Sequence, residues 1–338
     1  MEQIAILGAG SWGTALAKVL AERGHGVTLW AYEAEVAETI TRTQRNPLYL
    51  SDITLPAGIV ATSQLAAALA DTTVWVLVMP SQHVRAVMQQ SLPHLTATTT
   101  IVCCAKGIEC GTGMRMSEIL AELLPASAHA RCCVLSGPSF AKEVAERQPT
   151  AVVIAGTDAQ TTTRVQEMFR TDYFLTFTHR DVIGVELGGA LKNVMALATG
   201  MVEGMGLGHN TRAALITRGL YEMIKLGKAL GADPLTFAGL SGLGDLVLTC
   251  TGALSRNRHV GIEIGRGRTC HDVMREMRMV AEGVETTKAV QLLIQRTGVF
   301  APICSAVHDI LYTGKTPTHA LLDLVHLDLK EEFHSLLG

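Results

Sequence analysis

The sequence predicts two domains: a doubly wound α/β domain over residues 1–180 and an all-helical domain over residues 181–338. Three observations lead to this prediction. The first half alternates short, almost wholly apolar runs with helical stretches, which is typical of a parallel sheet covered by helices. A glycine-rich turn follows the first apolar run. Beyond about residue 180 the strand pattern ends, and long helical stretches follow.

The bulk composition excludes several classes of protein. With 338 residues, 48% of them hydrophobic and 17% charged, the chain is long and apolar enough for two globular cores. A net charge of -3 and an aromatic content of 4% favour neither the basic surface nor the stacking rings of a nucleic-acid-binding protein. The first residues have no basic region ahead of an apolar one, and no apolar run of about 18 residues lacks a charge. We therefore expect a cytoplasmic protein without a signal peptide or a membrane span.

The cysteines indicate packing rather than chemistry. There are eight, and no two have the C-x-x-C spacing of a zinc site or a redox dithiol. Most lie in apolar, strand-like stretches, which is typical of small buried side chains in a cytosolic protein. We expect no metal.

The first strand, turn and helix predict a nucleotide site. Residues 4–7 are an apolar strand, followed by Gly8-Ala9-Gly10-Ser11-Trp12-Gly13, then a helical stretch from residue 14 and a second strand over 27–30. A G-x-G-x-x-G motif alone is a weak signal, but between a strand and a helix in a unit of about 30 residues it is much stronger.

Each glycine of this motif is needed for a different structural reason. Gly8 permits the tight turn, Gly10 allows a pyrophosphate to approach the backbone, and Gly13 lets the helix pack close to the strand. The helix N-terminus then presents N–H groups and the positive end of its dipole to the phosphates. The alternative, a glycine turn without a ligand, is the weaker interpretation in this context.

The end of the second strand bears on the choice between NAD and NADP. An acidic residue there binds the ribose hydroxyls of NAD, but this sequence has Ala31, with Glu33 slightly beyond. Nothing there repels a 2′-phosphate, and Arg42 or Arg45 is available to bind one. The choice stays open at this point, with NADP use favoured.

Further strands and helices complete the predicted α/β domain. The strands are expected at residues 74–79, 100–105, 132–135 and 151–155, and the helices at 64–70, 84–90, 116–124 and 160–170. Ligands of such sheets collect at the carboxyl ends of the strands. Lys106 and residues 136–141 lie at two such ends and are candidate site residues, the alternative for Lys106 being a solvated loop lysine.

The second half predicts helices only. They are expected at residues 183–205, 211–230, 255–265, 272–279, 286–296, 306–312 and 320–337. The boundary between the halves has no long linker, so we expect them to pack tightly with a ligand site in the cleft.

Lys192 is the most unusual residue of the first of these helices. Within the apolar run 182–202 it is the only basic residue, and Glu186 is the only acid. A buried lysine is costly unless it is paired or has a function. The alternative is a lysine at the helix edge whose ammonium group extends to solvent.

Two further polar segments stand out in the second half. Asp245 is the only charge in an apolar, glycine-broken run over residues 240–250, and its alternative interpretation is a helix N-cap. The segment Ser255-Arg256-Asn257-Arg258 offers donors suited to an anionic phosphate, especially if Ser255 opens a helix. Its alternative is a solvated basic face.

Taken together, the motifs resemble the bacterial NAD(P)-dependent glycerol-3-phosphate dehydrogenases, almost from end to end. The matching blocks, in order, are Gly8 to Ala15, Ala105-Lys106-Gly107, Ser136 to Glu143, Gly188 to Asn193, Ala213 to Gly219, Gly242 to Leu246, Thr249-Cys250-Thr251, Ser255-Arg256-Asn257 and Val280-Ala281-Glu282-Gly283. The resemblance implies a Rossmann domain that binds NAD(P)H, a helical domain like that of 6-phosphogluconate dehydrogenase, and an active site between them. It also implies interconversion of dihydroxyacetone phosphate and sn-glycerol 3-phosphate for glycerophospholipid synthesis, and a homodimer.

The resemblance also implies roles for particular residues. Lys192 is expected to be the general acid and base, with Lys106 and Asp245 as its catalytic partners. The expected cofactor-binding residues are Gly8, Gly10, Ser11, Trp12, Gly13, Tyr32, Lys106, Ala141, Arg256, Val280 and Glu282. The expected substrate-binding residues are Lys106, Gly137, Ser139, Lys192, Asn193, Asp245, Thr249, Ser255, Arg256 and Asn257. Tyr32 stands where the family commonly has a basic or imidazole residue.

The chemistry of ketone reduction agrees with these roles. A lysine ammonium donates a proton and stabilises the developing alkoxide, whereas the reverse reaction needs the neutral amine. Burial, and Lys106 if it is near, would lower the pKa of Lys192, and Asp245 would raise it, so the net direction stays open. Arg256 and Asn257 are expected to bind the substrate phosphate and so orient the carbonyl.

Two alternatives to this function remain. A β-hydroxyacid or 6-phosphogluconate type of dehydrogenase also joins a Rossmann domain to a lysine-bearing helix, but the cluster Ser255-Arg256-Asn257 and Lys106 favour a triose phosphate. A dinucleotide-sensing binding module would need Gly8, Gly10 and Gly13, but not the three charged residues of the expected catalytic site.

Overall fold

The computed structural model describes residues 1–277 and 280–327 in two compact units. The first unit comprises residues 1–106 and 116–182, and the second comprises residues 107–115 and the chain from residue 183 onward. Two expected helices reach beyond the described residues: the part of 272–279 at residues 278 and 279, and the part of 320–337 from residue 328.

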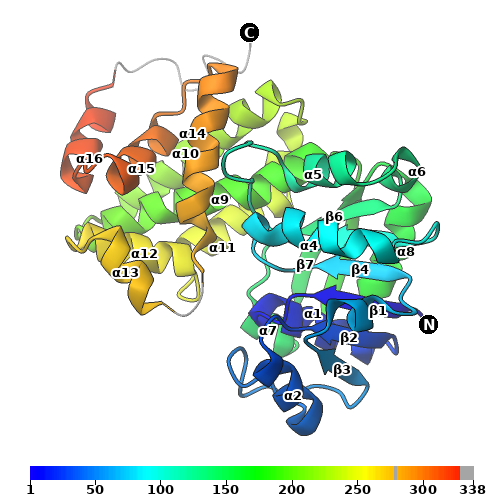
Figure 1. Cartoon of the computed structure of the whole chain (residues 1–338). Helices are drawn as coiled ribbons and strands as arrows, with labels where there is room; N and C mark the ends of the chain where they lie inside the picture. Colours follow the sequence, from blue (N-terminus) through cyan, green and yellow to red (C-terminus); the bar gives the residue numbers. More distant parts are fainter. Residues whose placement is uncertain (278–279, 328–338) are drawn as a thin grey trace. The chain divides into compact units, whose positions relative to one another are not determined.

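The first unit is built on one sheet, as the sequence predicts (Figure 1). Its eight described strands are ordered β3-β2-β1-β4-β5-β6-β7-β8, parallel except for the antiparallel pair β6 and β7. Strands β1, β4 and β5 are buried along nearly their whole length, because helices cover the middle of the sheet and only apolar runs tolerate that position. The strands are β1 (Gln3–Leu7), β2 (Gly26–Trp30), β3 (Ile59–Thr62), β4 (Val74–Leu77), β5 (Thr100–Cys103), β6 (Cys132–Ser136), β7 (Thr150–Gly156) and β8 (Phe174–His179).

Two strands of this sheet, β3 and β8, were not predicted from the sequence. Both lie at edges of the sheet, where one face or one side of the strand contacts solvent. In β8 the side chains of Leu175 and Phe177 are exposed, whereas those of Phe174 and Thr176 are buried. This half-buried alternation over a short segment is a weaker signal than the continuous apolar runs of the central strands.

Helices accompany the strands in chain order. Helix α1 packs against β2 and α7, α8 packs against β7 and β8, and α4 lies beside α5 (Figure 1). The side chain of Asp158 caps α8 by accepting a hydrogen bond from the Thr161 amide at 2.7 Å. The helices are α1 (Ser11–Glu22), α2 (Ala34–Thr43), α3 (Leu65–Leu69), η1 (Ser81–His83), α4 (Val84–Ser91), η2 (Leu92–His94), α5 (Met116–Leu123), α6 (Ala126–His129), α7 (Ala141–Ala145) and α8 (Ala159–Phe169).

The second unit consists of helices and their connections from residue 183 onward together with the non-helical segment 107–115, and α9 (Val182–Gly204) is its central helix (Figure 1). Every residue of α9 from Gly184 to Val202 is buried, and the unit's other described helices follow it in the chain. They are α10 (His209–Ala229), η3 (Pro234–Ala238), the π-helical turn η4 (Leu240–Gly244), α11 (Asp245–Thr251), α12 (Arg256–Gly265), α13 (Cys270–Glu276), α14 (Glu282–Thr297), α15 (Pro302–Tyr312) and α16 (Pro317–Val325).

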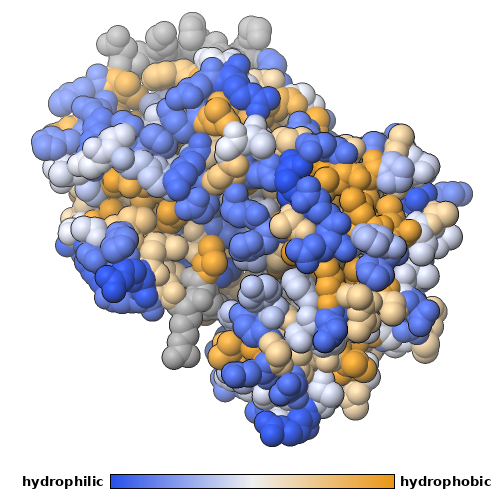
Figure 2. Space-filling view, viewed as in Figure 1, coloured by the Kyte–Doolittle hydropathy of each residue, from blue (hydrophilic) through white to orange (hydrophobic). Residues whose placement is uncertain are grey.

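Helix α9 is also the one described helix that is long and apolar enough to cross a membrane. However, 89% of its most apolar window is buried inside the structure. This is the environment of a core helix, which passes the same test of length and composition. Figure 2 shows one face of the molecule, where hydrophilic residues alternate with several groups of hydrophobic residues.

Residues 107–115 belong to the second unit, although they follow β5 of the first. Ile108 is fully buried in the helical core. Arg115 forms a buried ion pair with Glu186 of α9 at 2.9 Å, and Arg296 of α14 donates to the carbonyl of Thr112 at 3.1 Å. The buried Ile108 side chain, this ion pair and this hydrogen bond therefore hold the segment against the helices of the second unit.

Candidate active site

The glycine-rich turn of the first unit has the shape of a phosphate-binding loop. Gly8 has a φ of 123°, and a Cβ there would lie 2.8 Å from the Met79 nitrogen. A Cβ on Gly13 would lie 1.8 Å from the Gly8 oxygen, so only glycine permits this contact between helix and strand. Around Gly10, by contrast, a Cβ would meet nothing within 4 Å. Two glycines are therefore required by packing, and Gly10 leaves the open side that a pyrophosphate needs.

The start of α1 completes this loop. Gly10 is the N-cap residue of α1, and as a glycine it brings no side chain to cap the first turn of the helix. The indole Nε1 of Trp12 is buried and has no hydrogen-bond partner among the residues that the structure describes. These residues fit the diphosphate of a dinucleotide by the geometry of helix N-termini.

The end of β2 carries no buried acid. Ala31 is fully buried there, and Tyr32 is 82% exposed with its ring edge-on to Trp30 at a centroid distance of 6.5 Å. Glu33 occupies the N-cap position of α2 without a side-chain cap hydrogen bond. Arg45 is exposed and donates only a long hydrogen bond of 3.4 Å to the carbonyl of Ser51.

A second cluster of the first unit lies at the ends of β5 and β6. Lys106 Nζ donates to the Gly137 oxygen at 2.9 Å and to Ser139 Oγ at 3.5 Å. Gly137 has a φ of 140°, and a Cβ there would lie 3.0 Å from the Cα of Val152. Ala141 begins α7 directly after this turn. Lys106 is thus half-buried and held at the strand ends rather than solvated as a free loop residue.

Lys192 forms the centre of the second unit's polar cluster. Its Nζ lies 2.5 Å from Asp245 Oδ1 and 2.9 Å from Thr249 Oγ1, and the three residues are 6%, 1% and 5% exposed. The Thr249 hydroxyl donates to the Asp245 carbonyl at 2.6 Å, so its oxygen is oriented to accept from Lys192. Lys192 therefore does not extend to solvent, and the Asp245 carboxylate and the Thr249 hydroxyl are among the groups that stabilise its buried amine.

Asp245 is not the N-cap of α11, because the cap residue is Gly244. The π-helical turn η4 precedes it and ends at that glycine. A Cβ on Gly188 of α9 would lie 2.5 Å from the Ser241 oxygen of this turn. This close backbone approach brings Asp245 within reach of Lys192, one turn further along α9.

A second chain of hydrogen bonds runs beside Lys192. Asn257 Nδ2 donates to Asn193 Oδ1 at 2.9 Å, and Asn257 Oδ1 accepts from the Gly283 amide at 2.9 Å. The three residues come from α12, α9 and α14. Asn257 thus uses its carbonyl oxygen and one amide hydrogen in bonds that link three helices. Its second amide hydrogen can be donated to a ligand.

The rest of the predicted phosphate segment divides into two roles. Ser255 does open a helix, and its hydroxyl accepts from the Arg258 amide at 3.2 Å. Arg256 is exposed at the first position of α12. Arg258 forms a salt bridge with Glu203, at 2.5 Å from Nη2 to Oε1, and Glu203 also binds Arg212 at 2.9 Å. The Arg258 guanidinium is thus only half-buried and is held by a carboxylate that it shares with a second arginine. Arg256 is therefore the exposed cation of the segment.

Four glycines set the spacing of α9 and α12, and sequence reasoning missed them. A Cβ on Gly200 or Gly204 of α9 would lie 2.2 or 2.1 Å from a carbonyl oxygen of α12. Conversely, a Cβ on Gly261 or Gly265 would lie 2.3 or 2.1 Å from a carbonyl oxygen of α9. The signal in the sequence is the pair of G-x-x-x-G spacings, which permits two helix backbones to approach closely.

Two predicted cofactor contacts, Val280 and Glu282, lie at the start of α14. Val280 is exposed, and Glu282 is the first residue of the helix.

Among the described residues, no group of three His, Cys, Asp or Glu side chains is placed to hold a metal ion. Burial raises the pKa of Cys250 and of Cys132 to about 12, so neither is a thiolate nucleophile at neutral pH.

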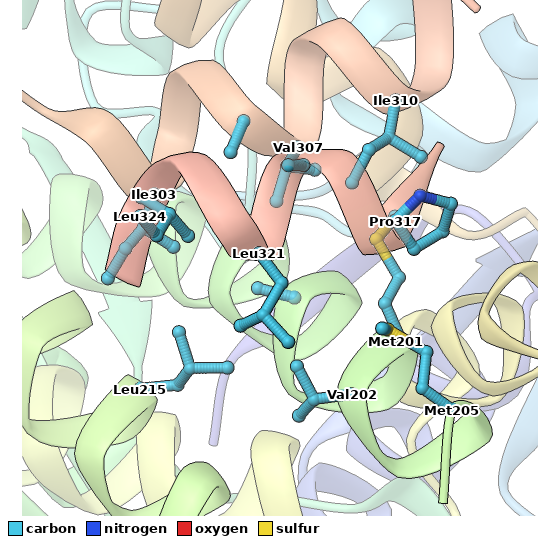
Figure 3. A pocket seen from close by; sticks show the side chains of 13 residues that line it. Met201, Val202, Met205, Leu215, Ile303, Val307, Ile310, Pro317, Leu321 and Leu324 are labelled. Atoms are coloured by element: carbon cyan, nitrogen blue, oxygen red, sulfur yellow. The ribbon is translucent and has the colours of Figure 1, made fainter. Parts of the chain in front are cut away.

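A cavity of about 30 Å³ lies elsewhere in the second unit (Figure 3). Its lining is almost wholly apolar and comes from α9, α10, α15 and α16, with Met201, Leu215, Val307 and Leu321 pointing into it. An anionic phosphate needs donors that this lining lacks. The cavity therefore does not belong to the site described above.

A dinucleotide-binding α/β unit followed by a helical unit with a buried, carboxylate-paired lysine defines an NAD(P)-dependent oxidoreductase. Comparison with known proteins specifies the family. The models of the NAD-dependent glycerol-3-phosphate dehydrogenase N-terminus and C-terminus match residues 3–162 and 181–322. This chain belongs to the NAD-dependent glycerol-3-phosphate dehydrogenase family.

Individual relatives agree with this assignment. The glycerol-3-phosphate dehydrogenase [NAD(P)+] of Geobacter metallireducens is 52% identical over 98% of this chain and 99% of its own length. The protein of the same name from Myxococcus xanthus is 47% identical over 97% of this chain and 98% of its own. The crystal structure of glycerol-3-phosphate dehydrogenase from Coxiella burnetii is similar with a TM-score of 0.91 and 38% identity, covering 96% of this chain and 99% of that one.

Proposed function

We propose that this chain interconverts dihydroxyacetone phosphate and sn-glycerol 3-phosphate with NAD(P)H, and that Lys192 transfers the proton. The observation that carries the proposal is the buried contact of Lys192 with Asp245 and Thr249. A fold does not by itself define a reaction, whereas a buried proton-carrying group with fixed partners supports a specific one.

Reduction of a ketone requires a hydride, a proton and stabilisation of the negative charge that develops on oxygen. NAD(P)H held by the glycine-rich turn supplies the hydride. In our proposal Lys192 donates its proton to the carbonyl oxygen and stabilises the alkoxide as it forms. In the reverse direction neutral Lys192 accepts the hydroxyl proton. Asp245 and Thr249 fix the position of Nζ, so that little reorganisation is needed at the moment of reaction.

The phosphate of the substrate requires cationic and N–H donors. We assign these to exposed Arg256 and to the remaining amide hydrogen of Asn257, at the start of α12. Binding energy from the phosphate then helps to orient the carbonyl, which lies three bonds away in a triose phosphate. Lys106, with Gly137 and Ser139, is assigned to the cofactor and substrate from the first unit.

The proposal has one decisive experiment. The purified chain is mixed with NADH or NADPH and dihydroxyacetone phosphate, and absorbance at the nicotinamide band is followed. A panel with 3-hydroxyacid precursors and 6-phosphogluconate, in the direction suited to each, separates the other dehydrogenase class. Oxidation of the nicotinamide only with dihydroxyacetone phosphate is the expected result. Turnover of a different panel member alone, or cofactor binding without any turnover, would contradict the proposal.

Three further properties belong to the same proposal. The product would feed glycerophospholipid synthesis, the enzyme would act in the cytoplasm, and it would be a homodimer. The family resemblance supports all three. Sedimentation of the purified chain measures the third directly.

A further inference from the structure

Asn46, in the loop between α2 and β3, is a fully buried polar residue that no role described so far includes. Its side chain forms four hydrogen bonds. Nδ2 donates to the Ala9 oxygen and to Thr14 Oγ1, both at 2.8 Å, and Oδ1 accepts from the amides of Leu48 and Tyr49 at 3.1 and 3.0 Å. An asparagine side chain has two donor hydrogens and two acceptor sites, so Asn46 is completely satisfied.

The first of these bonds controls the orientation of the Ala9–Gly10 peptide. In a trans peptide the C=O and the following N–H point in opposite directions. Because the Ala9 oxygen is held by Asn46, the N–H of Gly10 is turned away from Asn46. Gly10 is the glycine with open space around it, where the pyrophosphate is expected to lie.

The second bond ties the same turn to the helix that follows it. Thr14 lies in α1, almost completely buried, and its hydroxyl donates weakly to the Ala9 oxygen at 3.4 Å while accepting from Asn46. Asn46, Ala9 and Thr14 thus form a closed triangle beneath the glycine-rich turn. The triangle fixes the turn and the first N–H groups of α1 as one rigid element.

The acceptor side of Asn46 organises a different segment. Two amides of its own loop bond to Oδ1, which forms an Asx-type turn at residues 46–49. Arg45, a candidate for the 2′-phosphate, is its direct neighbour. One buried side chain therefore connects the glycine-rich turn with the loop that follows α2.

We infer that Asn46 is a positioning residue for the cofactor: it orients the Gly10 amide and the start of α1 without contacting the dinucleotide. The inference rests on the proposed use of NAD(P)H by this turn. A change at Asn46 should affect cofactor binding but not substrate binding, because none of the four hydrogen bonds of its side chain reaches the proposed substrate-binding residues of α9, α11 and α12. Loss of Asn46 weakens cofactor binding, while the proton-transfer residues keep their arrangement.

The test measures the Kd for NADH and for NADPH by fluorescence titration without substrate, and separately kcat and both KM values. Asn46→Asp keeps the acceptor oxygens but places an oxygen against the Ala9 carbonyl, and Asn46→Ala removes all four bonds. Both should raise the two cofactor Kd values about tenfold or more, since a buried group is left unpaired. We expect kcat and the KM for dihydroxyacetone phosphate to stay within about threefold, as for other effects confined to one ligand. Asn210→Ala, at an exposed position, is the matched control. It should change neither the cofactor Kd values nor kcat and the KM for dihydroxyacetone phosphate.

Two outcomes would overturn the inference. One is an unchanged Kd for both cofactors in folded Asn46→Asp. The other is a decrease in kcat, in cofactor affinity and in substrate affinity by similar factors, in proportion to the loss of thermal stability. That result would indicate a purely structural role. If the Asn46 variants do not fold, Thr14→Val, which removes one side of the triangle, and Thr14→Ser, which retains it, take their place. Cofactor titration needs no turnover, so it gives its answer even if the proposed reaction fails.

Discussion

Lys192 Nζ and Asp245 Oδ1 lie 2.5 Å apart in a region where both side chains are almost completely excluded from water. Two consequences follow from this pair. Removing either partner takes away the opposite charge that lies 2.5 Å from the other, and in the proposed mechanism the proton of Lys192 exchanges beside a fixed negative charge. If Lys192 transfers the proton as proposed, catalysis and stability depend on the same contact.

Lys192→Ala should reduce kcat by about 10⁴-fold or more, because it removes the proton donor and the charge that stabilises the alkoxide. The measurement is steady-state turnover with the folded fraction determined by circular dichroism. Lys228→Ala, at an exposed position of α10, is the control. Near-wild-type turnover by folded Lys192→Ala would remove Lys192 from the mechanism.

Asp245→Leu should destabilise the protein by about 3–5 kcal/mol, the usual cost of leaving a buried charge without its partner. The combined variant Lys192→Met with Asp245→Leu should recover much of this stability, since no unpaired charge remains. Denaturant unfolding of the three proteins measures the difference. If the double variant were no more stable than Asp245→Leu, the cost would lie in packing rather than in the broken ion pair.

Arg256→Ala should raise the KM for dihydroxyacetone phosphate about 10- to 100-fold, since a charge-assisted hydrogen bond to phosphate is lost. The Kd of NADH should change much less. Arg256→Lys retains the charge but not the planar fork, and an intermediate KM is expected. Exposed Arg275→Ala controls for the loss of surface charge. A change in cofactor affinity alone would show that Arg256 has been assigned to the wrong ligand.

Gly261→Ala should destabilise the protein by about 1–3 kcal/mol, because the added methyl must displace a backbone carbonyl of α9. Its Cβ would lie 2.3 Å from the Leu197 oxygen. Gly58→Ala is the matched control, since a Cβ there meets nothing within 4 Å. Thermal unfolding compares the two. Equal stability of both variants would mean that α9 and α12 separate at little cost.

Glu222→Gln should make stability less dependent on pH. Burial raises the pKa of Glu222 to about 7, although its carboxylate accepts from the amides of Ile303 and Cys304 at the start of α15. A carboxyl group with a raised pKa binds more protons when folded than when unfolded, so its contribution to stability is present below its unfolded pKa of about 4.3.

That contribution is lost as the pH rises through about 7. The free energy of unfolding of the wild type, relative to Glu222→Gln, should therefore fall between about pH 4.5 and 7.5, by at most about 1.4 kcal/mol per pH unit. Denaturant unfolding at a series of pH values measures this difference. A constant difference across the series would show that Glu222 does not titrate in this range.

Much of the fold could be predicted because central strands and α9 have strong local signals. A strand buried on both faces is a continuous apolar run, and the glycine motif marks the first turn. Strands β3 and β8 could not be predicted in this way, since an edge strand has one buried face and a mixed composition.

The candidate site was predictable where a charge stands alone in apolar sequence. Lys192 and Asp245 have this signal, and the structure places them in contact. Asn46 has no such signal, because an asparagine beside a proline is typical of any turn. Its bonds to Ala9 and Thr14 span more than 30 positions of the chain, and only the tertiary structure brings these residues together.

The membership of residues 107–115 in the second unit has a practical consequence for dissecting this protein. A fragment that ends at residue 182 would carry Ile108 and Arg115 away from their helical partners, exposing one apolar side chain and breaking the ion pair between Arg115 and Glu186. The two halves are thus interleaved in sequence. If the two halves were expressed separately, or exchanged between proteins at residue 182, residues 107–115 would have to be joined to the helical half in some other way.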